Sequence, residues 1–190
     1  MDYNKLFEKR NENFKFVLAS IDAGLKDTVI IGIDEFFWSL KEAIYDLTDE
    51  QLQAFPIEGH PSIHWIALHM LGNIEHFVNL AFTGQEGIVE YAHKYGTGAV
   101  PTPSDEMFST KELIEKLLEI REKTFTILDG LSEQDLLSVP PKNKARWKRR
   151  RLDAYNRTIF HAMAHLRQIW LLRGAQGLTD GSGWPLQHWA

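Results

Sequence analysis

Apolar residues recur along this chain at intervals of three and four, the spacing that gives an α-helix one apolar face. Five segments share this pattern, and Gly24 and Gly174 follow the first and the last of them. The fourth opens with the capping box Ser109-Thr-Lys-Glu112. The predicted helices are Lys5 to about Ala23, about Val29 to Asp46, Ser62 to about Phe82, Ser109 to about Asp129, and Leu152 to Arg173.

The alternation typical of strands is nearly absent. The stretch from Gln85 to Pro103 is rich in glycine and proline, which predicts a long connection. Four long helices with one long crossover loop are typical of a four-helix bundle. We therefore predict an all-α fold in which residues 1–190 form a single domain. Residues 1–27 would add an outer N-terminal helix, and the C-terminal tail 175–190 would dock through Trp184 and Trp189.

Two short motifs resemble one another. Leu47-Thr-Asp-Glu-Gln-Leu52 precedes Pro56, and Leu131-Ser-Glu-Gln-Asp-Leu136 precedes Pro140. Each motif follows one long helix and leads into a helix that carries histidines. Two copies of such a unit would place the histidine-bearing helices in equivalent positions, which favours one site shared between them. Chance similarity between short helix-capping sequences is the alternative.

The composition narrows the possible functions. The chain has 190 residues, enough for one domain with a sizeable core. It has no cysteine, which excludes disulfides, thiolate ligands and a cysteine nucleophile. The net charge of -5 argues against nucleic acid as a main partner. The chain shows neither an apolar run of membrane-spanning length nor a signal-peptide pattern, so we expect a cytoplasmic protein with no membrane partner.

The histidines carry the strongest chemical signal. His161 and His165 are four residues apart, so they share one helical face and can bind the same divalent cation. His69 lies in another apolar helical segment, where a buried imidazole needs a metal ion or a hydrogen-bond partner. We predict these three histidines as metal ligands. The stripes that contain them predict Asn73, Gln168 and His76 as neighbours that orient a ligand or contact substrate.

Three histidine ligands leave at least one coordination position open for water or substrate. Histidine ligands alone are compatible with zinc, nickel, iron, cobalt or manganese. The metalloprotease pattern HExxH is absent because Ala162 follows His161. The Glu-x-x-His pattern of carboxylate di-iron centres is also absent from the predicted bundle helices.

A basic run lies just before the last predicted helix. Residues 142–151 contain seven lysines and arginines, and positive charge opposes the dipole at a helix N-terminus. An acidic partner is therefore expected, either within the fold, in a partner subunit or in an anionic substrate. Arg149 and Arg150 are the candidate anion-binding residues, and an ordinary solvated loop is the alternative.

Taken together, the motifs resemble the DinB-like superfamily. The resemblance rests on the Leu47–Leu52 turn, on Ser62-Ile-His-Trp-Ile-Ala-Leu-His69 followed by Glu75, on His161-Ala-Met-Ala-His165-Leu-Arg-Gln168-Ile, and on the tail Gly183-Trp-Pro-Leu-Gln-His-Trp-Ala. It spans about Val29 to Ala190, and the added N-terminal helix and the basic loop depart from it. It implies a four-helix bundle, a divalent metal held by His69, His161 and His165, and a homodimer.

Some members of that superfamily are thiol-dependent transferases or isomerases. The resemblance therefore implies a metal-dependent thiol S-transferase that acts on a small molecule with a low-molecular-weight thiol as co-substrate. The catalytic base is unassigned, with His76 and Glu75 as candidates. The alternatives are a metal-dependent hydrolase, a non-catalytic stress-associated metal-binding module, and a metal-free helical interaction protein.

Overall fold

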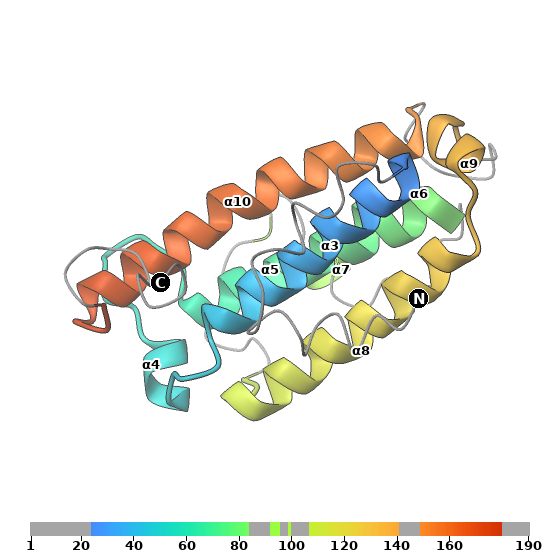
Figure 1. The fold of residues 1–190 in the computed structure, drawn as a ribbon. Helices are drawn as coiled ribbons and strands as arrows, with labels where there is room; N and C mark the ends of the chain where they lie inside the picture. The colour runs from blue at the N-terminus through green and yellow to red at the C-terminus, as the bar shows by residue number, and fades with distance from the viewer. Residues whose placement is uncertain (1–23, 84–91, 96–98, 100–106, 141–148, 180–190) are drawn as a thin grey trace.

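The computed structural model describes residues 24–83, 92–95, 99, 107–140 and 149–179 (Figure 1). Within these ranges all regular structure is helical, which confirms the all-α prediction. The predicted helix Lys5–Ala23, most of the crossover loop, positions 142–148 and the docking tryptophans lie outside the described residues. The elements are α3 (Leu25–Glu42), α4 (Asp49–Gln53), α5 (Ile63–Asn73), the π-helix η1 (Ile74–Asn79), α6 (Leu80–Thr83), α7 (Ala92–Tyr95), α8 (Thr110–Asp129), α9 (Glu133–Leu137) and α10 (Arg151–Ala175).

Four long helical segments surround the core (Figure 1). Helix α10 packs against α3 and against the continuous segment α5-η1-α6, and α8 packs against α3 and against η1 and α6. Helices α3 and α10 approach closely at Gly32, where an added Cβ would collide with the Tyr155 hydroxyl. The fully buried side chains include Ile33, Phe37, Leu40, Ile44, Leu52, Ile63, Ile66, Leu68, Met70, Leu71, Phe82 and Tyr95. A single apolar core therefore fills the space between the four segments.

The predicted helix boundaries agree with the structure at some ends and differ at others. Helix α8 starts at the predicted capping box, with the Glu112 backbone N–H donating to Ser109 Oγ at 3.2 Å. Helix α3 ends at Glu42, earlier than the predicted Asp46. The predicted helix Ser62–Phe82 is continuous, but its middle winds as a π-helix that the spacing of apolar residues did not predict.

The two similar sequence motifs form the same local structure. Each folds as a five-residue helix that begins with a capping box. The box joins Thr48 and Gln51 at the start of α4, and Ser132 and Asp135 at the start of α9. Helix α4 packs against α5, and α9 packs against α10. The two short helices lie at opposite ends of the bundle (Figure 1). Each unit thus leads from a long helix into a helix that carries histidines.

Two buried arginines hold α10 in place at its ends. The Arg151 guanidinium donates to the Phe82 carbonyl at 2.8 Å and to Ser138 Oγ at 2.7 Å. At the other end, Arg173 donates to both carboxylate oxygens of Asp46, at 2.7 and 2.8 Å. These hydrogen bonds keep the pKa of Asp46 below its usual range. Both ends of α10 are therefore fixed relative to α3 and α6, which sets the position of its central turns.

Candidate metal centre

Three histidines from two helices converge in the bundle. One ring nitrogen from each of His69, His161 and His165 lies within 4.8 Å of the others, and the ring centroids are 4.4 to 5.2 Å apart. The Nε2 atoms of His161 and His165 are 3.2 Å apart. Two nitrogens bound to one tetrahedral zinc ion at ~2.0–2.1 Å are about 3.3 Å apart. The donor type and the spacing of the His161–His165 pair therefore fit one divalent cation, and His69 offers a third nitrogen within 4.8 Å of both.

Hydrogen bonds on the far side of two rings fix their tautomers. The His69 Nδ1–H donates to the Tyr95 backbone carbonyl, and the His165 Nδ1–H donates to Gln168 Oε1 at 2.6 Å. A neutral imidazole has one N–H, so Nε2 of each ring keeps its lone pair. Metal-binding histidines usually have such an outer hydrogen bond, which orients the ring and raises its basicity. Both Nε2 atoms thus carry the lone pair that a metal ligand needs, and that of His69 accepts a hydrogen bond from the Asn73 side chain at 3.1 Å.

His161 differs from the other two histidines. Its Nδ1 atom is buried and has no hydrogen-bond partner among the described residues. In the neutral site the His161 Nε2–H donates to His165 Nε2 at 3.2 Å, which leaves the buried Nδ1 lone pair of His161 without a partner in the described part of the chain. A divalent cation would take the place of that proton between the two Nε2 atoms.

Burial keeps the three imidazoles neutral. It is the main reason that the pKa of each is lowered, and the pKa of His161 falls to about 4. The other two histidines and Arg157 lower the His161 pKa further. A metal ligand has to be deprotonated, so a lowered pKa reduces competition from protons at neutral pH.

Two further residues surround His69. The Trp65 indole stacks on the imidazole, with the ring planes 9° apart and the centroids 5.2 Å apart. The Asn73 side-chain N–H donates to the His69 backbone carbonyl at 2.7 Å, and Asn73 Nδ2 lies 3.1 Å from His69 Nε2. The ring is therefore held on its face by Trp65 and at its edge by Asn73.

The comparison with protein families agrees with this geometry. A family model described as the DinB superfamily matches residues 39–169, more than half of the chain. The chain belongs to the DinB superfamily. The matched region contains the three histidines and both capped short helices. Comparisons with curated proteins and with solved structures found no match.

In this DinB-superfamily protein, the structure brings some of the predicted site residues to the histidine cluster and leaves others apart. Asn73 and Gln168 contact His69 and His165 as described above. His76 is not part of the cluster, and its ring packs edge-on against Phe77. Glu75 is buried and forms an ion pair with Lys123 of α8 at 3.8 Å. Neither candidate for the catalytic base therefore belongs to the cluster.

The described part of the basic run has its own local partner. Arg150 donates to Asp153 of α10 at 2.9 Å, and this pairing keeps the pKa of the Asp153 carboxyl below its usual range. An acidic residue of the same fold is thus the partner expected for the positive helix start. Arg149 is exposed beside it.

Two residues that contact His69 were not predicted from the sequence. Trp65 lies four residues before His69, so helical spacing alone places the two rings on one face. Tyr95 lies in α7, within the stretch predicted as an irregular connection. Nothing in the sequence pairs its backbone carbonyl with a histidine 26 residues earlier.

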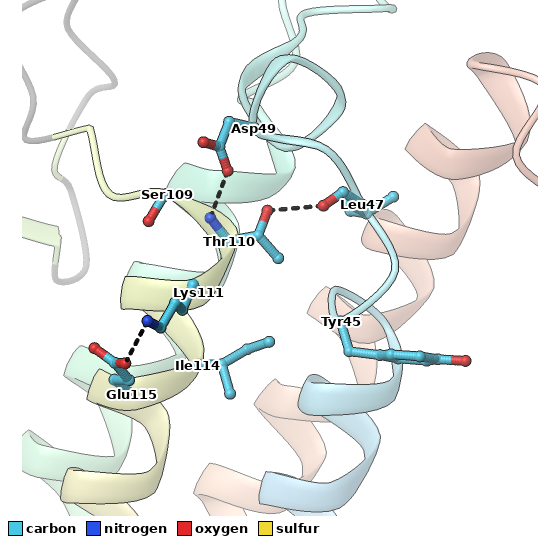
Figure 2. Close-up of a pocket in the computed structure, with 8 residues that line it drawn as sticks. All are labelled: Tyr45, Leu47, Asp49, Ser109, Thr110, Lys111, Ile114 and Glu115. Carbon is cyan, nitrogen blue, oxygen red and sulfur yellow. Dashed lines mark hydrogen bonds and ion pairs between the residues drawn. The ribbon is translucent and has the colours of Figure 1, made fainter.

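A pocket of about 590 Å³ lies elsewhere on this DinB-superfamily protein, at the start of α8 (Figure 2). Its principal polar groups bond to one another: the Thr110 backbone N–H donates to Asp49 Oδ1 at 2.7 Å, and Thr110 Oγ1 donates to the Leu47 carbonyl at 2.9 Å. The lining residues include none of the clustered histidines. This pocket is a junction between α8 and the loop before α4.

Among the ranges that the structure describes, no helix has both the length and the apolar character that crossing a bilayer requires.

Proposed function

We propose that this DinB-superfamily protein binds one divalent metal ion through His69, His161 and His165 and transfers a low-molecular-weight thiol to a small electrophilic molecule. Proteins of this superfamily generally bind metals. The observation that carries the proposal is the convergence of three neutral imidazoles, two of which are oriented by outer hydrogen bonds. The thiol-transfer step rests on the resemblance to thiol-dependent relatives.

The two sides of the site differ in their exposure to solvent. His69 is buried, whereas His161 and His165 are half-buried, so a substrate approaches from the α10 side. Tyr95 and Gln168 hold two of the rings, and Trp65 covers His69. When bound, a divalent ion lowers the pKa of a coordinated thiol and supplies a thiolate at neutral pH. The chain has no cysteine, so the sulfur would come from the co-substrate.

The first experiment measures the metal itself. Elemental analysis of protein purified without an affinity tag is expected to find about one divalent ion per chain and to identify it among zinc, nickel, iron, cobalt and manganese. His161→Ala and His165→Ala should each weaken binding by more than about 100-fold, because loss of an outer partner alone costs about 10–100-fold. The helical far-UV signal should stay unchanged.

The matched control is His76→Ala, because His76 is a half-buried histidine outside the cluster. It should retain the full metal content. Full metal retention in both His161→Ala and His165→Ala would contradict the ligand assignment.

The second experiment tests the reaction. The metal-loaded protein is assayed with panels of thiols and electrophiles, and thioether formation that requires both metal and thiol supports the transferase. Hydrolysis without thiol would instead favour a metal-dependent hydrolase. Full metal loading with no turnover would favour a non-catalytic binding module.

A homodimer and a cytoplasmic location stay predictions. Phe160, Met163 and Leu171 are large apolar side chains exposed on α10, and they give a homodimer a contact face. Sedimentation analysis of the protein and of Phe160→Glu tests this: a dimer that becomes a monomer in the variant supports it.

A further inference from the structure

Arg157 is positioned beside the histidine cluster. It precedes His161 by four residues on α10, which puts the two side chains on one face, one turn apart. Its guanidinium carbon lies 5.3 Å from the centroid of the Phe77 ring. Phe77 is buried in η1, the continuation of the helix that carries His69 and Asn73. The guanidinium therefore lies over the seam between the two helices that supply the histidines.

The charge of Arg157 acts on the cluster. A positive charge one helical turn from His161 opposes the binding of a divalent cation, because like charges repel. The arginine residue is exposed overall, so a ligand from solvent can reach it. A ligand that carries a negative charge would offset the repulsion and gain from both cations.

The arginines predicted from sequence are placed less well for this role. Arg150 precedes His161 by 11 residues, at the N-cap of α10, about three turns from the histidines. Arg149 lies before the first residue of the helix. Arg157 is the arginine for which both the helical register and the contact with Phe77 give a position next to the cluster.

We propose that Arg157 binds the anionic group of a thiol whose sulfur occupies the position among the three histidines. The inference rests on the proposed function and narrows its co-substrate to short thiols that carry a carboxylate or similar anion. One helical turn, about 5.4 Å, separates the backbone positions of Arg157 and His161 along α10. A planar guanidinium can donate two parallel hydrogen bonds to a carboxylate, which a neutral thiol cannot accept.

The test compares two probe thiols on cobalt(II)-loaded protein. 3-Mercaptopropionate and 2-mercaptoethanol both offer sulfur, but only the first carries a carboxylate. Binding is followed by the thiolate-to-cobalt charge-transfer absorbance. We expect 3-mercaptopropionate to bind about 10-fold more tightly, in line with a hydrogen bond to a charged group of about 1.5 kcal/mol. Raising the ionic strength should reduce that preference.

Three variants sharpen the comparison. Arg157→Ala should reduce the preference to less than twofold without loss of cobalt, and Arg157→Lys should keep part of it. The matched control is Arg167→Ala, which removes an exposed arginine of α10 two residues after His165, on a different face. That variant should keep the full preference.

The outcomes separate this inference from the proposed function. Equal affinities for the two thiols in the unmodified protein, or a preference that survives in Arg157→Ala, would overturn the role of Arg157 and leave the metal site standing. A protein that binds no cobalt at all would overturn both.

Discussion

Two of the polar centres in the described part of this bundle are built in opposite ways. Arg121 of α8 donates to Asp34 of α3 from Nη2 at 2.9 Å and from Nε at 3.2 Å, and the arginine side chain is only 4% exposed. The charges are opposite, so each group satisfies the other. The centre at His69, His161 and His165 instead brings together three groups of the same kind, whose ring nitrogens face one another. The oppositely charged groups of the first centre bind each other, whereas the three converging imidazoles of the second can act as ligands for a cation.

The two polar centres also differ in how far other side chains cover them. The Arg121 guanidinium also lies 4.7 Å from the centroid of the Phe125 ring, so α8 itself covers the pair. The histidine cluster is buried on the α5 side and half-buried on the α10 side. The first centre holds two helices together, and the second is accessible from outside.

The largest effect is expected from breaking the closed centre. Asp34→Ala removes an acidic partner of a buried arginine and should destabilise the fold by about 3–5 kcal/mol, because the buried positive charge loses this carboxylate. Urea denaturation followed by circular dichroism measures the change. Cobalt binding to the folded fraction should be unaffected, because the pair is separate from the histidines.

The double variant Asp34→Ala, Arg121→Met is the control. Removal of both charges should recover most of the lost stability, since a buried ion pair is often replaceable by apolar side chains. If the double variant is no more stable than Asp34→Ala, the lost stability does not come from breaking the pair of Asp34 and Arg121.

The open centre should make the metal-free fold sensitive to pH. The pKa of His161 is about 4 in the folded protein, and an unfolded histidine titrates near ~6.5. As the pH falls, the unfolded chain binds the proton first, so the contribution of His161 is present above about pH 6.5 and is lost between about 6.5 and 4. The lowered pKa values of His69 and His165 act in the same direction. We expect a loss of about 2 kcal/mol from His161, less than the full shift implies because the residue is half-buried.

Denaturation curves of metal-free protein at several pH values measure this loss. His161→Gln removes one titrating ring and should flatten the curve over the same window. A stability that rises as the pH falls from 6.5 to 4 would contradict the burial of neutral imidazoles.

The two centres also differ in how far sequence predicts them. The spacing of His161 and His165 and the apolar surroundings of His69 were sufficient to group the three histidines and to place Asn73 and Gln168 near them. The pair of Asp34 and Arg121 could not be predicted, because the residues lie 87 positions apart and only the packing of α3 on α8 joins them.

The same distinction holds for the fold. Apolar spacing and capping residues predicted the long helices, since both are local properties. The winding of η1 and the hydrogen bond from His69 to Tyr95 depend on contacts with other segments, so no local pattern shows them. Arg157 was overlooked for a related reason, because its contact with Phe77 requires η1 to bring that ring towards α10.

The smallest effect is expected at the outer hydrogen bond of the open centre. Gln168→Ala removes the acceptor for the His165 Nδ1–H and should weaken cobalt binding by about 10-fold. Gln168→Glu keeps an acceptor and adds negative charge, so its affinity should equal or exceed that of the unmodified protein. Isothermal titration with cobalt(II) measures both. A full loss of affinity in Gln168→Glu would contradict the role of the side-chain oxygen as the acceptor for His165.

The π-helix has a consequence for the way this chain tolerates length changes. Each π turn contains about one residue more than an α turn, so η1 stores an extra residue between His69 and Phe82. Deletion of a single codon there would let the segment rewind as ordinary α-helix, with the half that precedes it unmoved. Phe77 would then turn away from Arg157 while the three imidazoles kept their places. An insertion or loss of one amino acid in Ile74–Asn79 can therefore change the surroundings of Arg157 without moving the three imidazoles.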